Sequence, residues 1–518
     1  MTNIKLSPLF SDGTVLQRGA PVKIRGECLP GESVKISFLG NDYSAGADGS
    51  GRWLCPIGEF PARSEPCVMT VSSGGETVTV RDILIGDVWL CSGQSNMELM
   101  LNRAHHNYPD EITLTNPLIR QLKIPQMYNF NGPSGELSDC AWEKFSPETA
   151  MNFTAAGYFF AKKLHERYEI PIGLLACAVG GTPAAAWMSR EMLADFPALT
   201  AEADECADGD YIEKTLNEYE EYSRDYHRRL DEKDEGLLKH WASAAYNDAD
   251  WDETPVFAQV NQSGAYWYRK TVDVPRELWG KPAVIFLGTA VDMDEVFVNG
   301  EKIGVTYYRY PPREYSLTLP EGRLTVAVRL LCFNGFGGFT PGKNLFIAAE
   351  NRCIDMGGAW KRRLGTEFEN QKGQTFFAYK PTGLFNGMIS PLAGYGMKGV
   401  IWYQGESDTG NPDSYARKLT ELINGWRKLW GNPKLPFLFT QLANYEFTGG
   451  ADWDLLREQQ KKCLSLPNTG LAAAYDIGEY NDLHPQNKRD IGERLARLAM
   501  RAAYGEKLPP NMFEMYNI

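Results

Sequence analysis

Short segments of alternating apolar and polar residues fill the first 85 positions of the chain. The segments ESVKISFLG and ETVTVRDILIG show this alternation, and turn sequences such as PGE and SGGE separate them. Regularly spaced strands with β-branched residues and turn signals are typical of a β-sandwich. The pattern therefore predicts an immunoglobulin-like β-sandwich over residues 1–85.

Longer apolar runs begin near residue 86 and alternate with amphipathic segments. The runs DVWLC and IPIGLLACAV lie on either side of the helix-like segment TAAGYFFAKKLHERY, and GVIWY and LPFLF repeat the pattern late in the chain. Apolar strands that alternate with helices are typical of a parallel sheet covered on both faces. We predict one α/β domain built from residues 86–240 and 367–518.

Between these two parts the pattern changes twice. Residues 201–240 are rich in charge and favour a helix, which predicts a solvated connector between domains. Residues 241–366 return to alternating strands, and FVNGEKIG places a type I′ hairpin turn at Asn299-Gly300. We therefore predict a β domain over residues 241–366, inserted into the α/β domain.

The charge balance narrows the class of partner. The 518 residues include 53 basic and 66 acidic side chains, so the formal net charge is −13. Nucleic acids and anionic membranes attract basic surfaces, and we expect neither as a partner. The opening MTNIKLSPLF does not have the pattern of a signal peptide, and no run of about 18 apolar residues is available to span a membrane. We expect a cytoplasmic protein as the sequence is given, or a periplasmic or secreted one if a leader was removed.

The ten cysteines are spread singly, without a CxxC pair or a Cys/His cluster. In a chain of this length, that spacing predicts free thiols rather than a disulfide framework or a zinc site. We expect no metal.

Small and polar residues follow the predicted strands of the α/β domain. A parallel sheet binds its ligands at the carboxyl ends of its strands, so these residues are candidates for a site. They include a serine after a glycine, a pair of glycines, a glutamine close to a glutamate, and a histidine behind an aspartate. In chain order they are Ser95, Gly180, Gly181, Gln404, Glu406, Asp482 and His484.

This combination of residue types suits acyl transfer. A serine hydroxyl is a weak nucleophile until a neighbouring base takes its proton, and histidine is the usual base near neutral pH. A carboxylate fixes the tautomer of the histidine and stabilises the imidazolium. Backbone N–H groups at glycine turns and an amide side chain are suitable donors for the tetrahedral oxyanion.

The segments GDVWLCSGQSNME, AVGGTPAAAW, GVIWYQGESD and NDLHPQNKRDIGERLA together resemble the sialate O-acetylesterase family of SGNH-type serine esterases. The resemblance implies an α/β, three-layer SGNH-hydrolase core with a parallel sheet. It implies an N-terminal β-sandwich from LSPLFSDGTVLQRGAPVKIRG onward, and an inserted galactose-binding-like jelly roll that includes GAYWYRKTVDVP and VFVNGEKIG.

The resemblance also implies an activity: the removal of O-acetyl groups from carbohydrates through an acetyl-serine intermediate. The family name points to the 9-O-acetyl group of sialic acid, and acetylated xylan or another plant glycan is the alternative substrate. A non-catalytic sugar-binding protein and a glycoside hydrolase with Glu98 and Glu406 as its carboxylates stay open as other functions. Neither of these two functions explains the serine and the histidine.

By resemblance, Ser95 is the nucleophile, His484 the base and Asp482 the acid of a catalytic triad. Asp476 and Glu406 are competing candidates for the acid. Ser92, on the strand side of Gly93, is the rival serine, and we expect it to be buried.

For the oxyanion hole, the resemblance implies the N–H of Ser95, a backbone N–H at Gly180 or Gly181, and the side chain of Gln404. The remaining polar residues of these segments are expected to orient the catalytic groups or to contact substrate; they are Asn96, Glu406 and Asp476. The mechanism needs no cofactor, and its partners are an O-acetylated sugar and water. A homo-oligomer is compatible with the sequence.

Overall fold

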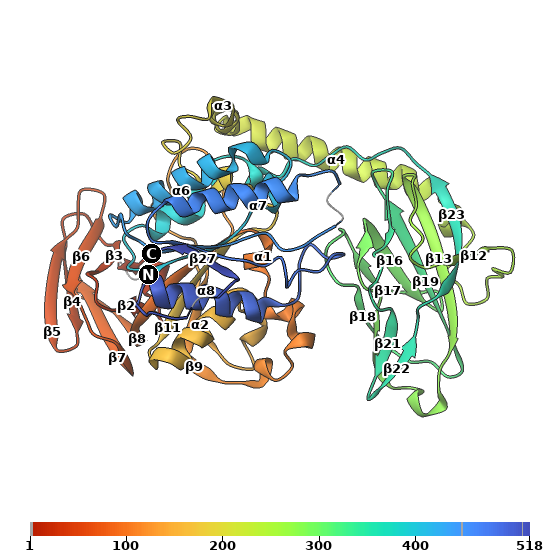
Figure 1. Cartoon of the computed structure of the whole chain (residues 1–518), viewed down its shortest axis with the longest axis horizontal. Helices are drawn as coiled ribbons and strands as arrows, with labels where there is room; N and C mark the ends of the chain where they lie inside the picture. The colour runs from red at the N-terminus through yellow and green to blue at the C-terminus, as the bar shows by residue number, and fades with distance from the viewer. Residues whose placement is uncertain (1–3, 447–448, 510) are drawn as a thin grey trace. The chain divides into compact units, whose positions relative to one another are not determined.

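The computed structural model describes residues 4–446, 449–509 and 511–518. The chain forms two compact units: Met1–Ile212 with Phe376–Ile518, and Glu213–Thr375 (Figure 1). The second unit therefore interrupts the first along the sequence. It begins inside the charged segment that we had expected to connect domains. Among the described residues, no helix has the length and hydropathy needed to cross a membrane.

The first unit opens with short antiparallel strands whose side chains alternate between buried and exposed. Along β6, for example, Trp53, Cys55 and Ile57 are buried and the residues between them are exposed. One three-stranded sheet has the order β1 (Lys5–Leu6), β3 (Val22–Glu27) and β6 (Arg52–Gly58). The other strands of this region are β2 (Val15–Gln17), β4 (Ser33–Phe38), β5 (Asn41–Gly46) and β7 (Arg63–Ser73), which pair with one another or with the long strand β8 (Glu76–Gly93).

Strand β8 continues into the main sheet of the first unit. Its last half is fully buried, as are all five residues of β24, which is the pattern of a strand covered on both faces. The order is β10-β9-β11-β8-β24-β25-β26-β27; the six inner strands are parallel and the two edge strands are antiparallel. The predicted parallel α/β sheet is thus confirmed. The remaining bounds are β9 (Asn116–Lys123), β10 (Trp142–Phe145), β11 (Ile172–Ala178), β24 (Gly399–Tyr403), β25 (Phe437–Thr440), β26 (Thr469–Ala472) and β27 (Glu514–Asn517).

Helices cover both faces of this sheet, so the unit has three layers (Figure 1). Helices α2 (Ala155–Tyr168) and α8 (Lys488–Ala502) pack with Trp89 of β8 on one face. Helices α6 (Tyr415–Leu429) and α7 (Trp453–Lys462) pack with Leu90 of β8 on the other. The short helix α1 (Ser95–Glu98) follows β8 directly, and α3 (Pro197–Cys206) precedes the second unit.

The second unit is mostly antiparallel sheet. Six strands have the order β12-β23-β13-β19-β16-β17, and four more have the order β18-β14-β21-β22. Positive φ angles at Asn299 and Gly300, between β16 and β17, confirm the predicted hairpin turn. The bounds are β12 (Asp252–Pro255), β13 (Gly264–Asp273), β14 (Pro282–Phe286), β15 (Ala290–Val291), β16 (Met293–Val298), β17 (Glu301–Thr306), β18 (Glu314–Thr318), β19 (Arg323–Cys332), β20 (Gly338–Phe339), β21 (Phe346–Ala349), β22 (Arg352–Asp355) and β23 (Ala359–Glu367).

The charged segment before these strands is not wholly solvated. It forms α4 (Gly209–Lys233) and α5 (Glu235–Leu238), and Tyr226 of α4 is completely buried. In the second unit, the buried Arg329 of β19 pairs with Asp231 at 2.5 Å and Asp234 at 2.7 Å. Although α4 is highly charged, it therefore still packs through a narrow stripe of buried residues, Tyr226 and Leu230.

Candidate active site

The turn after β8 places Ser95 at the carboxyl end of this central strand. Gly93 has φ +130°, and a Cβ there would overlap the carbonyl oxygen of Tyr403 on the neighbouring strand β24, so only glycine fits. The backbone N–H of Gln94 donates to that same carbonyl at 2.9 Å. Ser95 then begins α1 and is partly exposed, whereas Ser92 is completely buried, as predicted.

The predicted glycine turn after β11 lies beside this serine. A Cβ on Gly180 would be 3.4 Å from Cβ of Ser95. The Gly180 N–H donates to Oε2 of Glu98, at the end of α1, over 2.6 Å. Gly181 has φ +75°, and a side chain there would collide with the Tyr379 hydroxyl. The segments that follow β8 and β11 therefore meet at Ser95. Glu98 of the first segment is hydrogen-bonded to Gly180 of the second.

The side chain of Gln404 does not serve as the free amide donor that the sequence suggested. It is completely buried, and its Nε2 donates to the Thr182 carbonyl at 3.2 Å and to Oδ2 of Asp408 at 2.7 Å. Its Oε1 accepts from the Tyr415 hydroxyl at 2.9 Å. Both amide hydrogens are thus used inside the protein, and we withdraw Gln404 as an oxyanion donor.

His484 lies in the loop before α8 and is only 3% exposed. Its backbone N–H donates to Oδ1 of Asp482 at 2.8 Å, which holds the Asp-x-His segment in a turn. Burial, together with the positive charges of Arg103 and Lys488, lowers the pKa of the His484 ring to about 3. The imidazole is therefore neutral near pH 7, as a general base must be.

Both rival carboxylates are bound elsewhere. Asp476 forms a two-point ion pair with Arg494 of α8, with both contacts at 2.6 Å, which lowers the pKa of the carboxyl. Glu406 accepts from Nδ2 of Asn96 at 2.6 Å, and its burial raises the pKa of its carboxyl. Asp476 therefore ties the segment after β26 to α8, and Glu406 ties its loop to α1. Asp482 remains the predicted acid.

Asn96, the residue after the predicted nucleophile, connects three segments of the site. Its Nδ2 donates to Glu406 and, at 3.0 Å, to the carbonyl of Leu483, the residue before the predicted base. Its Oδ1 accepts from the ammonium of Lys488 at 2.6 Å. Asn96 is completely buried, so each of its contacts is shielded from water.

Sequence reasoning missed Lys488. This lysine is completely buried, and desolvation lowers the pKa of its ammonium to about 7, against the opposing charges of Glu406 and Asp482. A lysine in the first turn of a helix opposes the helix dipole, so its position at the start of α8 was the available signal. Gln94 was also missed: its Oε1 accepts from the N–H groups of Gly405 and Ser407, both at 3.3 Å.

Across residues 4–446, 449–509 and 511–518, no three His, Cys, Asp or Glu side chains are grouped so that they could hold a metal ion. The residues gathered at the edge of the sheet are a serine, a neutral imidazole, backbone N–H groups and carboxylates. This set is suited to nucleophilic attack on an ester carbonyl.

The family model described as "Carbohydrate esterase, sialic acid-specific acetylesterase" matches residues 85–209 and 370–501. These residues cover the main sheet from the end of β8 to α8, together with every candidate catalytic residue. The α/β part of the chain is thus similar to this family of carbohydrate esterases.

Individual relatives agree with this family. Sialate O-acetylesterase of Rattus norvegicus is 35% identical over 144 residues, which are 24% of this chain and 27% of that protein. The Homo sapiens protein of the same name is 32% identical over 148 residues, or 25% and 28%. The chain thus matches little more than a quarter of the length of these relatives. A crystal structure of a carbohydrate acetylesterase from Xanthomonas citri has a TM-score of 0.61 and 26% identity, covering 98% of this chain and 76% of that one.

Proposed function

We propose that the protein is a serine esterase that hydrolyses O-acetyl groups on carbohydrates. The observation that carries the proposal is the meeting of Ser95 and Gly180 at the carboxyl edge of the sheet, with the loop of His484 tied to the same helix through Asn96. The family match over this part of the chain supports the same reaction.

In the proposed mechanism, Ser95 Oγ attacks the acetyl carbonyl while the neutral His484 ring takes the hydroxyl proton. The tetrahedral intermediate collapses, the sugar oxygen leaves with that proton, and acetyl-Ser95 remains. A water molecule then attacks the acetyl carbonyl while His484 takes its proton. The bond between Ser95 Oγ and the acetyl carbon breaks, the imidazolium returns the proton to Oγ, and acetate is released. Asp482 stabilises the imidazolium that forms in each step.

Two backbone N–H groups are proposed to bind the oxyanion. The N–H of Ser95 belongs to the first turn of α1, where backbone donors have no partner within the helix. The N–H of Gly180 is the second donor, and it becomes available when Glu98 releases it. Each donor of this kind typically lowers the barrier by about 3–4 kcal/mol.

The family name supports O-acetylated sialic acid as the first candidate substrate, for which we propose the 9-O-acetyl group, and acetylated xylan is the second. Acetate release from 9-O-acetylated sialosides and from acetylated xylo-oligosaccharides tests both. Release from neither, by a folded protein that also fails to hydrolyse 4-nitrophenyl acetate, would refute the esterase. Release from only one identifies the sugar class.

The finer architecture is part of the proposal. We interpret the sheets over residues 1–85 as an immunoglobulin-like β-sandwich, and the strands within 241–366 as a galactose-binding-like jelly roll. The alternating burial of the short strands and the antiparallel pairing in the second unit support these interpretations.

A further inference from the structure

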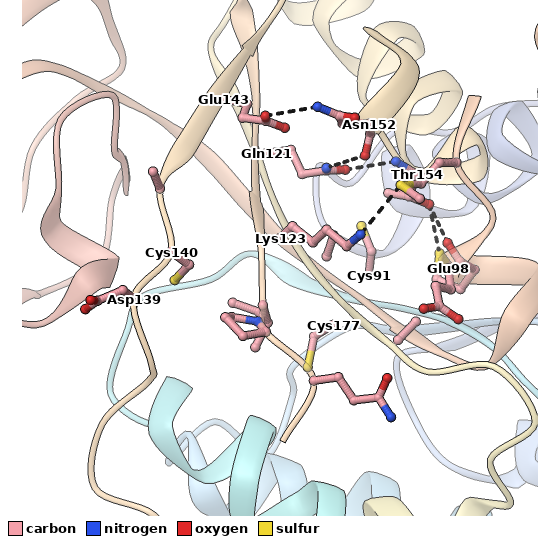
Figure 2. A pocket seen from close by; sticks show the side chains of 18 residues that line it. Cys91, Glu98, Gln121, Lys123, Asp139, Cys140, Glu143, Asn152, Thr154 and Cys177 are labelled. Carbon is pink, nitrogen blue, oxygen red and sulfur yellow. Dashed lines mark hydrogen bonds between the residues drawn. The ribbon is translucent and has the colours of Figure 1, made fainter. Parts of the chain in front are cut away.

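A pocket with a volume of about 660 Å³ opens at the carboxyl ends of β9 and β11 (Figure 2). Its walls come from β9 and the residues after it, from β11, from α1 and from the segment before β10. Among the lining residues are Glu98, Lys123, Gln126, Asp139, Glu143 and Cys177. This volume lies within the range of pockets that bind small organic ligands, and it is much larger than an acetyl group needs.

Glu98 links this pocket to the proposed nucleophile. Its side chain lines the pocket, and its carboxylate accepts the N–H of Gly180 at 2.6 Å. A Cβ on Gly180 would lie 3.1 Å from that carboxylate oxygen and 3.4 Å from Cβ of Ser95. Glu98 therefore connects the pocket to the glycine turn that lies beside the proposed nucleophile.

The charges of the lining select the chemistry of the ligand. Three carboxylates line the pocket, those of Glu98, Asp139 and Glu143, together with one ammonium, that of Lys123. Glu143 accepts from Nδ2 of Asn152 at 3.2 Å, and the Lys123 ammonium donates to the sulfur of Met100 at 3.6 Å. Thioether sulfur is a weak hydrogen-bond acceptor, so an oxygen atom of a ligand would be a stronger partner for the Lys123 ammonium. Carboxylates accept hydrogen bonds from hydroxyl groups, whereas they repel a ligand carboxylate.

We propose that this pocket binds the uncharged, hydroxyl-rich part of the acetylated sugar, with Glu98 accepting a hydrogen bond from a sugar hydroxyl. This inference rests on the proposed esterase function and adds the sugar subsite to it. When the sugar hydroxyl donates to the Glu98 carboxylate, it replaces the Gly180 N–H as the hydrogen-bond donor. The released N–H then points to the oxyanion, so that sugar binding completes the oxyanion hole.

The test compares a sugar ester with an ester that has no sugar. Glu98→Gln keeps the shape of the side chain and removes its charge. The sugar ester is the 9-O-acetylated sialoside or the acetylated xylo-oligosaccharide, whichever releases acetate faster from the unaltered protein, and the other ester is 4-nitrophenyl acetate. We expect the ratio of kcat/KM between the sugar ester and 4-nitrophenyl acetate to fall about tenfold, mostly through a higher KM for the sugar. Glu148→Gln, an exposed carboxylate bonded to Ser146 outside the pocket, should leave that ratio within twofold.

Ala141→Trp gives a second measurement, because Ala141 is an exposed residue of the pocket lining and the indole would fill the space. It should also raise KM for the sugar ester about tenfold. An unchanged ratio in Glu98→Gln, or an unchanged KM in a folded Ala141→Trp variant, would overturn the pocket as the sugar subsite. Activity on 4-nitrophenyl acetate that depends on Ser95 would then leave the esterase proposal intact, so the two failures can be told apart.

Discussion

The ammonium of Lys488 donates a hydrogen bond to the side-chain oxygen of Asn96 at 2.6 Å, and both residues are completely buried. Through the other end of its amide, Asn96 binds the carbonyl of Leu483 beside His484 and the carboxylate of Glu406. The helix of the proposed nucleophile and the loop of the proposed base are therefore held by one polar network. Hydrogen bonds that are shielded from water, as those of Asn96 are, fix geometry to a degree that surface contacts do not.

Ser95→Ala should abolish most of the turnover of 4-nitrophenyl acetate while the fold persists. Removal of a triad member typically leaves only the catalysis of the oxyanion hole and binding, of order 10³–10⁴ over water. Ser92→Ala is the matched control, because Ser92 lies three residues before Ser95, near the end of β8, and is completely buried. Equal activity of the two variants, with contaminating esterase excluded, would show that Ser95 is not the nucleophile.

Asp482→Asn should lower kcat by about 10⁴-fold, because the proposed role of this carboxylate is to stabilise the imidazolium. The equivalent change in serine proteases has a cost of this size. Asp476→Asn is its matched control. It breaks an ion pair with Arg494 and should cost stability but only a small part of kcat. The reverse pattern, with Asp476→Asn inactive and Asp482→Asn active, would move the acid to Asp476.

Lys488→Met should shift the acid limb of the kcat/KM profile to higher pH. The positive charges of Arg103 and Lys488 both lower the pKa of the His484 ring. The negative charges of Glu406 and Asp482 act on the Lys488 ammonium and raise its pKa, against the larger effect of burial. Without the ammonium the imidazolium costs less, so the ring is protonated at a higher pH and activity is lost earlier on acidification.

Lys488→Arg keeps the charge and should restore the acid limb more closely than Met, although the larger group must fit the same site. Measurement of kcat/KM for the three proteins, from below the His484 pKa of about 3 up to pH 9, checks this. A lysine with only a structural role would lower kcat/KM evenly across that range and leave the limb in place.

Much of the main sheet could be predicted, because buried parallel strands are continuous apolar runs and their carboxyl ends collect small and polar residues. The position of Gly180 beside Ser95 follows from that rule. The direction of a side chain does not follow from it. Gln404 stands at the correct strand end, yet its amide turns inward to Thr182 and Asp408. Lys488 reaches Asn96 across 392 positions of sequence, and no local pattern contains such a contact.

Gly93→Ala should destabilise the protein by more than the usual cost of a strained backbone, which is about 1–3 kcal/mol. Two effects add at this position. The φ of +130° lies outside the range that alanine favours, and the new methyl group would overlap the backbone of Tyr403 on the adjacent strand. Because β8 and β24 are bonded in register next to the site, the strands must separate or the turn must move, and Ser95 moves with it.

Gly58→Ala separates these two effects. Gly58 has φ +101°, and a Cβ there would meet no atom within 4 Å, so this variant has the backbone strain without the collision. Denaturant unfolding of both variants gives the comparison. We expect Gly58→Ala to cost about 1–3 kcal/mol and Gly93→Ala clearly more, with a loss of esterase activity only in Gly93→Ala. Equal losses of stability with full activity in both would mean that the approach of β24 does not fix the turn that carries Ser95.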